Sequence, residues 1–319
     1  MNYSDDGYAA MLLTMALSPD REEYARPYSV QEFHRLEAAV RGTDVRRLGR
    51  LLNEDISGLM MRLGMSEEEA YRAFTLLHRS VQLSYALEGF ERQAIRVVTC
   101  FDPDYPQRLT HKLRDMAPAF YYVCGREALL TKPAIAIVGI SGVKTTPEVR
   151  DGIESIVREA VEQGYAIVTG GELGVSRVAA GVARDCGGCL LDVLGGGLLE
   201  HIHRDGIAEM IAMDRCAAVS LEHPEAMFTV SHAIARNKLL FSLADAAFIF
   251  NTDGRRGEID ILENRYCDWV YAWEGCRENR ALFAHGANPL KSLDKLDLRE
   301  MSRHWESSRS EQLNMFDLF

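Results

Sequence analysis

The sequence predicts an α/β fold with a doubly wound, mostly parallel sheet and a small helical region in front of it. The first observation is an apolar run, Ala134–Val138, which stops at a glycine-rich turn and is followed by a helical pattern. The second is that this unit of strand, turn and helix recurs along the chain to about residue 285. Strands that alternate with helices in this rhythm are typical of parallel sheets covered on both faces.

The first unit also indicates where its helix begins. Thr146 suits the N-cap and Pro147 the first helical position. Ile153, Ile156 and Val157 then continue an apolar face at helical spacing. A helix that begins after a buried strand offers unpaired N–H groups and a positive dipole end to an anion.

Five further apolar runs have the length and composition of strands, and three helical patterns lie between them. We expect strands at residues 165–169, 189–194, 216–220, 246–250 and 268–273, and helices near 174–185, 231–243 and 257–265. Several of these strands end in glycine-rich turns. Open parallel sheets bind their ligands at the carboxyl ends of the strands, which is where these turns fall.

The chain divides into three predicted regions. These are a helical domain at residues 1–92, the sheet domain at 93–290 and a flexible tail at 291–319. Helical spacing and a capping box of Ser66 and Glu69 characterise the first region. Two short strands are expected near 95–100 and 117–125, and the second should join the edge of the sheet.

Composition narrows the function classes. The formal net charge is −11, so a nucleic-acid contact has to rest on a local basic patch. No apolar run approaches the length of a membrane span and the first residues lack a signal-peptide pattern, which favours the cytoplasm. The seven cysteines are scattered and fit reduced thiols, and Cys186 and Cys189 are expected at a helix end, where a redox pair does not belong.

The candidates for holding a phosphate backbone share a position at or near the end of a strand or the start of a helix. They are Gly139, Ser141, Gly142, Lys144, Gly170, Gly171, Arg177, Arg236, Asn237, Lys238, Arg255 and Arg256. If they converge on one crevice, it would contact the backbone and not read base sequence. Phe228 and Phe241 are candidates for stacking on bases, with core packing as the alternative.

Several segments resemble the motifs of one family. They are Asp102–Pro106 with Leu109, Tyr121–Gly125, Ala136–Gly139, Ala166–Gly170, Gly195–Leu198, Arg236–Lys238 and Gly286–Leu290. Their order is similar to that of the DNA processing protein A family, DprA or Smf. The family's pattern differs at Ser141, at Ser176 and in the loop 253–258, so the chain resembles a divergent member.

This resemblance implies an extended Rossmann domain behind a SAM-like helical domain. It also implies a protein without catalytic residues or a cofactor that binds single-stranded DNA, forms a homodimer and helps to load RecA recombinase in natural transformation. No residue cluster in the sequence indicates a metal site, since His201 and His203 have no third ligand nearby.

A nucleotide-binding or nucleotide-hydrolysing protein of the cytokinin-activating type is the alternative. Such hydrolases share the general fold, and residues 253–260 resemble their glycine-rich loop. Glycosidic cleavage needs a carboxylate against the ribose and a cation on the phosphate. Glu258 or Asp260 with Arg256 could supply these groups.

The tail contains a second resemblance, independent of the fold. Gln312, Leu313, Met315 and Phe316 are similar to the short motif by which bacterial replication and repair proteins bind the DNA polymerase sliding clamp. An amide can set the register while the apolar side chains fill a pocket. Folding of the tail onto its own domain is the alternative.

Overall fold

The computed structural model describes residues 3–18, 24–140, 145–252, 256–293 and 297–303. The chain forms two compact units. The first comprises residues 1–128 and 194–236, and the second comprises 129–193 and 237–319. The domain boundaries that the sequence predicts near residues 92 and 290 stay predictions.

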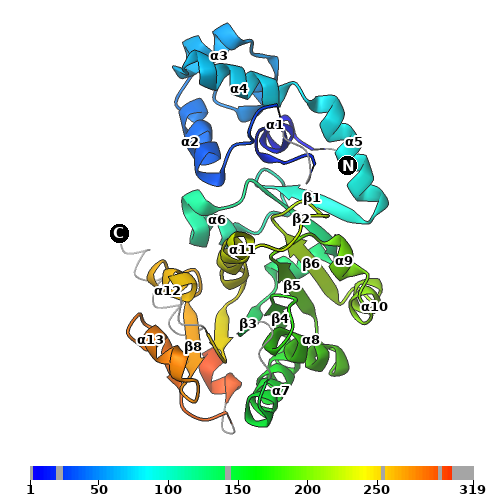
Figure 1. The fold of residues 1–319 in the computed structure, drawn as a ribbon, viewed down its shortest axis with the longest axis vertical. Helices are drawn as coiled ribbons and strands as arrows, with labels where there is room; N and C mark the ends of the chain where they lie inside the picture. Colours follow the sequence, from blue (N-terminus) through cyan, green and yellow to red (C-terminus); the bar gives the residue numbers. More distant parts are fainter. Residues whose placement is uncertain (1–2, 19–23, 141–144, 253–255, 294–296, 304–319) are drawn as a thin grey trace. The chain divides into compact units, whose positions relative to one another are not determined.

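Helices dominate the N-terminal part of the first unit, in blue to cyan in Figure 1. They are α1 (Asp5–Thr14), α2 (Val30–Arg41), α3 (Ile56–Leu63), α4 (Glu67–Leu77) and α5 (Ser80–Arg92), with a 3-10 turn at Leu48–Asn53. The predicted capping box at the start of α4 is present, because Ser66 Oγ accepts from Glu69 N at 3.3 Å and Glu69 accepts from Ser66 N at 3.0 Å. Their apolar faces enclose a core that includes Met11, Phe33 and Leu59.

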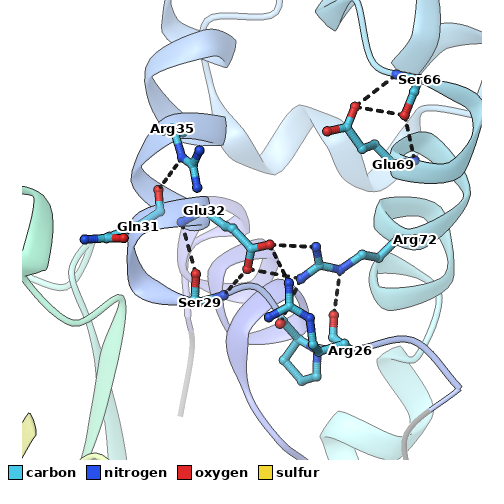
Figure 2. Close-up of polar contacts among 9 residues, drawn as sticks. Arg26, Ser29, Gln31, Glu32, Arg35, Ser66, Glu69 and Arg72 are labelled. Atoms are coloured by element: carbon cyan, nitrogen blue, oxygen red, sulfur yellow. Dashed lines mark hydrogen bonds and ion pairs between the residues drawn. The ribbon is translucent and has the colours of Figure 1, made fainter.

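Arg72 of α4 connects α4 to α2 and the segment before α2 (Figure 2). Its guanidinium donates to the carbonyls of Arg26 and Pro27 at 2.8 and 2.9 Å and to Glu32 at 3.0 Å, and it lies 4.2 Å from the Tyr28 ring centroid. The hydrogen bond from Arg72 holds the pKa of Glu32 well below its usual range. We call these five residues the Arg72 network.

The first unit also contains three antiparallel strands. β1 (Ile95–Thr99) pairs with β2 (Phe120–Gly125), and β2 pairs with β6 (Cys216–Ser220). The strand expected within residues 117–125 joins the edge of the sheet as predicted, because β2 pairs with β6, and β1 lies on its other side. The short helices of this unit are α6 (Gln107–Leu113), α9 (Leu199–Ile202) and α10 (Ile207–Ala212), with a 3-10 turn at Arg114–Met116.

The second unit contains the parallel sheet (Figure 1). Its strands are β3 (Ala134–Val138), β4 (Ala166–Thr169), β5 (Leu190–Leu194), β7 (Ala246–Ile249), β8 (Trp269–Trp273) and β9 (Asn288–Leu290). Parallel pairing gives the order β5-β4-β3-β7-β8-β9. The strand order reverses between β3 and β7, so the doubly wound, mostly parallel fold that the sequence predicts is confirmed.

Helices connect these strands at the predicted places. They are α7 (Pro147–Glu162), α8 (Val175–Asp185), α11 (Val230–Leu243) and α12 (Arg256–Glu263). The short helix α13 (Arg280–Phe283) and the 3-10 turns at Glu127–Thr131 and Arg277–Asn279 were not predicted. Thr146 is the N-cap of α7 as expected, since its hydroxyl accepts from Val149 N at 3.3 Å. Within the described ranges, none of the helices has the length and apolar character needed to cross a membrane.

Candidate nucleic-acid interface

The carboxyl ends of β3, β4 and β7 lie side by side at one edge of the second unit's sheet. Gly139 follows β3 and Asn251 lies shortly after β7. Asn251 Oδ1 accepts from Ile140 N at 2.8 Å, so this side chain holds the turn after β3. The turn therefore begins at the point where the strand order reverses, which is the place where open parallel sheets bind ligands.

Gly139 is required here for space. A Cβ at residue 139 would clash with Asn251 Oδ1 and with the side chain of Val175, the first residue of α8. The absence of a side chain lets the turn after β3, the amide of Asn251 and the start of α8 approach one another. The structure thus explains why a glycine occupies this candidate position.

A buried chain of hydrogen bonds shapes the turn after β4. Thr169 ends β4 and faces Asp192 of β5, and both side chains are at most 1% exposed. The Thr169 hydroxyl donates to Asp192 Oδ1 and accepts from Gly171 N at 3.1 Å. Because the carboxylate takes the hydroxyl proton, the oxygen of Thr169 remains as the acceptor for Gly171.

This chain changes the expected role of Gly171. Its φ of 69° lies in the left-handed region that favours glycine. Its N–H donates to Thr169, so that amide maintains the turn and does not point at a ligand. Gly171 therefore contributes to the candidate site through the backbone shape of the turn.

A groove of about 710 Å³ lies between α7 and α8, which pack against each other. It begins at the amino ends of the two helices, with Thr145 before α7 and Leu173 and Gly174 before α8. Val178 and Val182 also line it. We call it the α7–α8 groove.

Arg150 and Arg158 of α7 and Arg177 of α8 line this groove together with Glu154 and Asp185. Arg158 is held by Glu154 at 2.7 Å. Arg150 and Arg177 are exposed, and neither makes an ion pair with any residue that the structure describes. The predicted candidate Arg177 is thus the third residue of α8, and Arg150 of α7 is a second available cation in the same groove.

The three predicted candidates on α11 have different surroundings. Arg236 is buried, at 7% exposure, and Asn237 is half-buried. Lys238 is engaged by Asp260 of α12, with 3.0 Å between Nζ and Oδ2. Replacing Arg236 would therefore disturb packing as well as charge, which makes it a poor probe of binding.

The two candidate stacking residues differ sharply in exposure. Phe241 is fully buried, so it packs in the core. Phe228 is 56% exposed and lies in the first unit against the Gly195–Gly197 turn, where a Cβ on Gly195 would lie 3.1 Å from its ring. Core packing, the alternative to stacking on bases, is thus confirmed for Phe241 but not for Phe228.

Some candidates fall outside the residues that the structure describes. These are Ser141, Gly142, Lys144, Arg255 and the tail residues Gln312, Leu313, Met315 and Phe316, together with the side chain of Arg256. Their proposed contacts with DNA or with the sliding clamp stay predictions.

Sequence reasoning missed three residues of this region. Arg150 lies at the border of the buried face of α7, on the same side as Ile153 and Val157, so the helical period alone does not mark it as exposed. Asp192 is a charged residue inside an otherwise apolar strand, which is a signal of a buried partner. Asn251 follows β7 and carries no such signal.

Asp260, one of the two candidate carboxylates of the hydrolase alternative, is already engaged by other side chains. Asp260 already contacts Lys238 and also accepts from Asn264 Nδ2 at 2.9 Å. Among the described residues, no group of three or more His, Cys, Asp and Glu side chains is placed to hold a metal ion.

The fold and this edge define a Rossmann-like protein with a glycine-shaped turn region and an adjoining arginine-lined groove. A family model described as DNA recombination-mediator protein A matches residues 96–266, more than half of the chain. The chain belongs to this family, and the predicted resemblance to DprA is confirmed. A comparison with curated protein sequences gives no match.

Two solved structures have a similar fold. The X-ray structure of DNA processing protein A from Streptococcus pneumoniae has a TM-score of 0.65 and 18% identity over 92% of this chain and 97% of that chain. DNA processing protein A from Helicobacter pylori, described for its single-stranded DNA binding mode, has a TM-score of 0.50 and 21% identity over 62% of this chain and 93% of that chain. At these identities the likeness concerns the fold.

Proposed function

We propose that this protein is a cytoplasmic, non-enzymatic DNA-processing protein that binds single-stranded DNA through its backbone. Its role would be to assist recombination and natural transformation by loading RecA. Family membership and the Helicobacter pylori neighbour's described single-stranded DNA binding support the substrate class.

One observation carries the proposal most strongly. Arg150 and Arg177 are exposed on either side of the α7–α8 groove and have no ion-pair partner among the described residues, in a chain with a formal charge of −11. An arginine without a protein carboxylate is available for a phosphate, which it binds with charge-assisted hydrogen bonds. The groove adjoins the turns at the carboxyl edge of the sheet, so one strand could contact both.

The test is fluorescence anisotropy with labelled oligo-dT at two salt concentrations, comparing the wild type with Arg150→Ala plus Arg177→Ala. For single strands the slope of log K against log salt falls by about 0.7 for each phosphate that the protein no longer neutralises. We expect the double variant to bind about tenfold more weakly near 0.1 M salt and to reduce the slope by about 1.4.

Arg299→Ala plus Arg303→Ala is the matched control. Both arginines are exposed and lie outside the groove, so the same charge is removed elsewhere in the same unit. Equal losses of affinity in the two double variants would show a general charge effect and would count against the groove. No binding by the wild type at low salt would remove the proposal, and a nucleotide screen with Glu258→Gln as control would test the hydrolase alternative.

The partners belong to the same proposal. RecA loading and homodimer formation rest on the family. The tail motif at Gln312–Phe316 supports docking on the sliding clamp. A clamp pull-down that is unaffected by Gln312→Ala plus Phe316→Ala would contradict the clamp assignment, and a monomer by light scattering at micromolar concentration would contradict the dimer.

A further inference from the structure

The ion pair between Lys238 and Asp260 lies at the predicted binding motif of α11. Lys238 Nζ is 3.0 Å from Asp260 Oδ2 and 5.6 Å from the centroid of the Tyr266 ring. The ammonium therefore has a carboxylate and an aromatic face beside it. The Lys238 side chain keeps 21% of its surface exposed and that of Asp260 keeps 41%, so solvent and solutes reach the pair.

Asp260 is held in a defined orientation. Its second oxygen, Oδ1, accepts from Asn264 Nδ2 at 2.9 Å, and the same amide donates to the backbone carbonyl of Asp260 at 2.9 Å. One turn of α12 thus fixes the carboxylate so that Oδ2 is left for Lys238. Both oxygens have a partner, which is the arrangement of a positioned acceptor and not of a freely rotating surface side chain.

We propose that Asp260 is an internal competitor for the DNA phosphate at Lys238, and that it thereby lowers the affinity of the site. This inference rests on the proposed function. A carboxylate oxygen and a phosphate oxygen make the same kind of charge-assisted bond to an ammonium. Lys238 neutralised by Asp260 attracts a phosphate less than a free lysine does, because the two negative charges also repel each other.

The energies make this exchange feasible. A partly exposed ion pair contributes about 0 to 1 kcal/mol, so a DNA phosphate held nearby by other contacts can replace Asp260. Lys238 also differs from Arg150 and Arg177, which have no carboxylate partner among the described residues. Asp260 therefore makes Lys238 a conditional contact, while the two arginines of the groove are always available.

The decisive variant is Asp260→Asn, which removes the charge and keeps an oxygen for Asn264. Its matched control is Glu263→Gln, on the same helix. Glu263 contacts His285 Nδ1 at 3.0 Å, so this change removes the same charge from α12 without touching Lys238. Both variants are combined with Lys238→Ala in a double-mutant cycle.

The readout is anisotropy of labelled oligo-dT over a series of salt concentrations. We expect Asp260→Asn to bind about two- to fivefold more tightly near 0.1 M salt than Glu263→Gln, the range that an exposed ion pair covers. Its salt slope should be steeper by about 0.7, which corresponds to one more neutralised phosphate. Both gains should vanish when Lys238 is alanine. If Asp260→Asn lowers the melting temperature more than Glu263→Gln does, the substitution disturbs the fold, and Asp260→Ser is then used in place of Asp260→Asn.

The outcomes separate this inference from the proposed function. The competitor role is overturned if Asp260→Asn and Glu263→Gln change the affinity for oligo-dT equally. It is also overturned if the gain in affinity persists when Lys238 is alanine. Both results leave the proposed DNA binding intact. No binding by either the wild type or Asp260→Asn at low salt overturns both. Binding by Asp260→Asn alone supports the competitor role in its strongest form.

Discussion

The Arg72 network of the helical region and the α7–α8 groove are both rich in arginine, yet they use it in opposite ways. Arg72 donates to two backbone carbonyls and to Glu32 (Figure 2). Its guanidinium also packs on Tyr28. Arg150 and Arg177 line a groove and have no carboxylate partner among the described residues. An arginine whose three guanidinium nitrogens all donate inside the protein stabilises the fold, whereas one without a carboxylate partner at a groove is available to a ligand.

Net charge and arginine count therefore do not locate a binding surface. The protein carries a formal charge of −11, and acidic side chains neutralise arginines such as Arg158. What separates the two regions is the set of acceptors that the fold places around each guanidinium.

Arg72→Ala should lower the free energy of unfolding by about 3 kcal/mol, because it removes hydrogen bonds to two backbone carbonyls and to Glu32, each worth about 1 kcal/mol. Urea denaturation measures the change. Arg92→Ala is the control, since its pair with Glu88 is exposed and should be worth about 0.5 kcal/mol or less. A destabilisation in Arg72→Ala no greater than in Arg92→Ala would remove the distinction between the two kinds of arginine.

The stabilising effect of Arg72 should depend on pH. Its hydrogen bond lowers the pKa of Glu32 in the folded state, so the unfolded chain binds the proton more readily. That stability is present above the unfolded pKa of about 4.5 and is lost as the pH falls below it. The difference between wild type and Arg72→Ala should therefore be widest above about pH 5 and narrow toward pH 3. A difference that widens on acidification would contradict this assignment.

Thr169→Val should cost about 2 kcal/mol in unfolding free energy, because Asp192 loses a buried donor and Gly171 loses its acceptor. Thr169→Ser keeps both bonds and is the matched control. If the turn after β4 contacts DNA, Thr169→Val should also weaken oligo-dT binding without changing the salt slope, since no charge is removed. If Thr169→Val and Thr169→Ser weaken oligo-dT binding to the same degree, the loss of affinity does not come from the missing hydroxyl group.

Arg150→Ala plus Arg177→Ala should have the smallest effect on stability, about 0.5 kcal/mol or less, because neither side chain has an ion-pair partner in the described part of the chain. The same protein is expected to lose DNA affinity, so stability and binding should separate. A large drop in the stability of this variant would show that the groove arginines are structural, as Arg72 is.

Much of the fold could be predicted because its signals are local. The apolar run before Gly139, the N-cap Thr146 and the capping box of Ser66 and Glu69 each specify an element from a few neighbouring residues. The neighbours of the strand expected within residues 117–125 could not be predicted in this way, because β2 pairs with residues about 100 positions away in β6.

The candidate site could be predicted only in part, for the same reason. Local sequence signals specify the order of strands and helices, the glycine turns at the carboxyl edge and the placement of Arg177 at the start of α8. The hydrogen bond of Thr169 to Asp192, the ion pair of Lys238 with Asp260 and the position of Arg150 at the groove depend on how these elements pack in the folded chain. Secondary structure follows from short-range periodicity and capping, whereas the partner of a charged side chain is set by packing between elements distant in the chain.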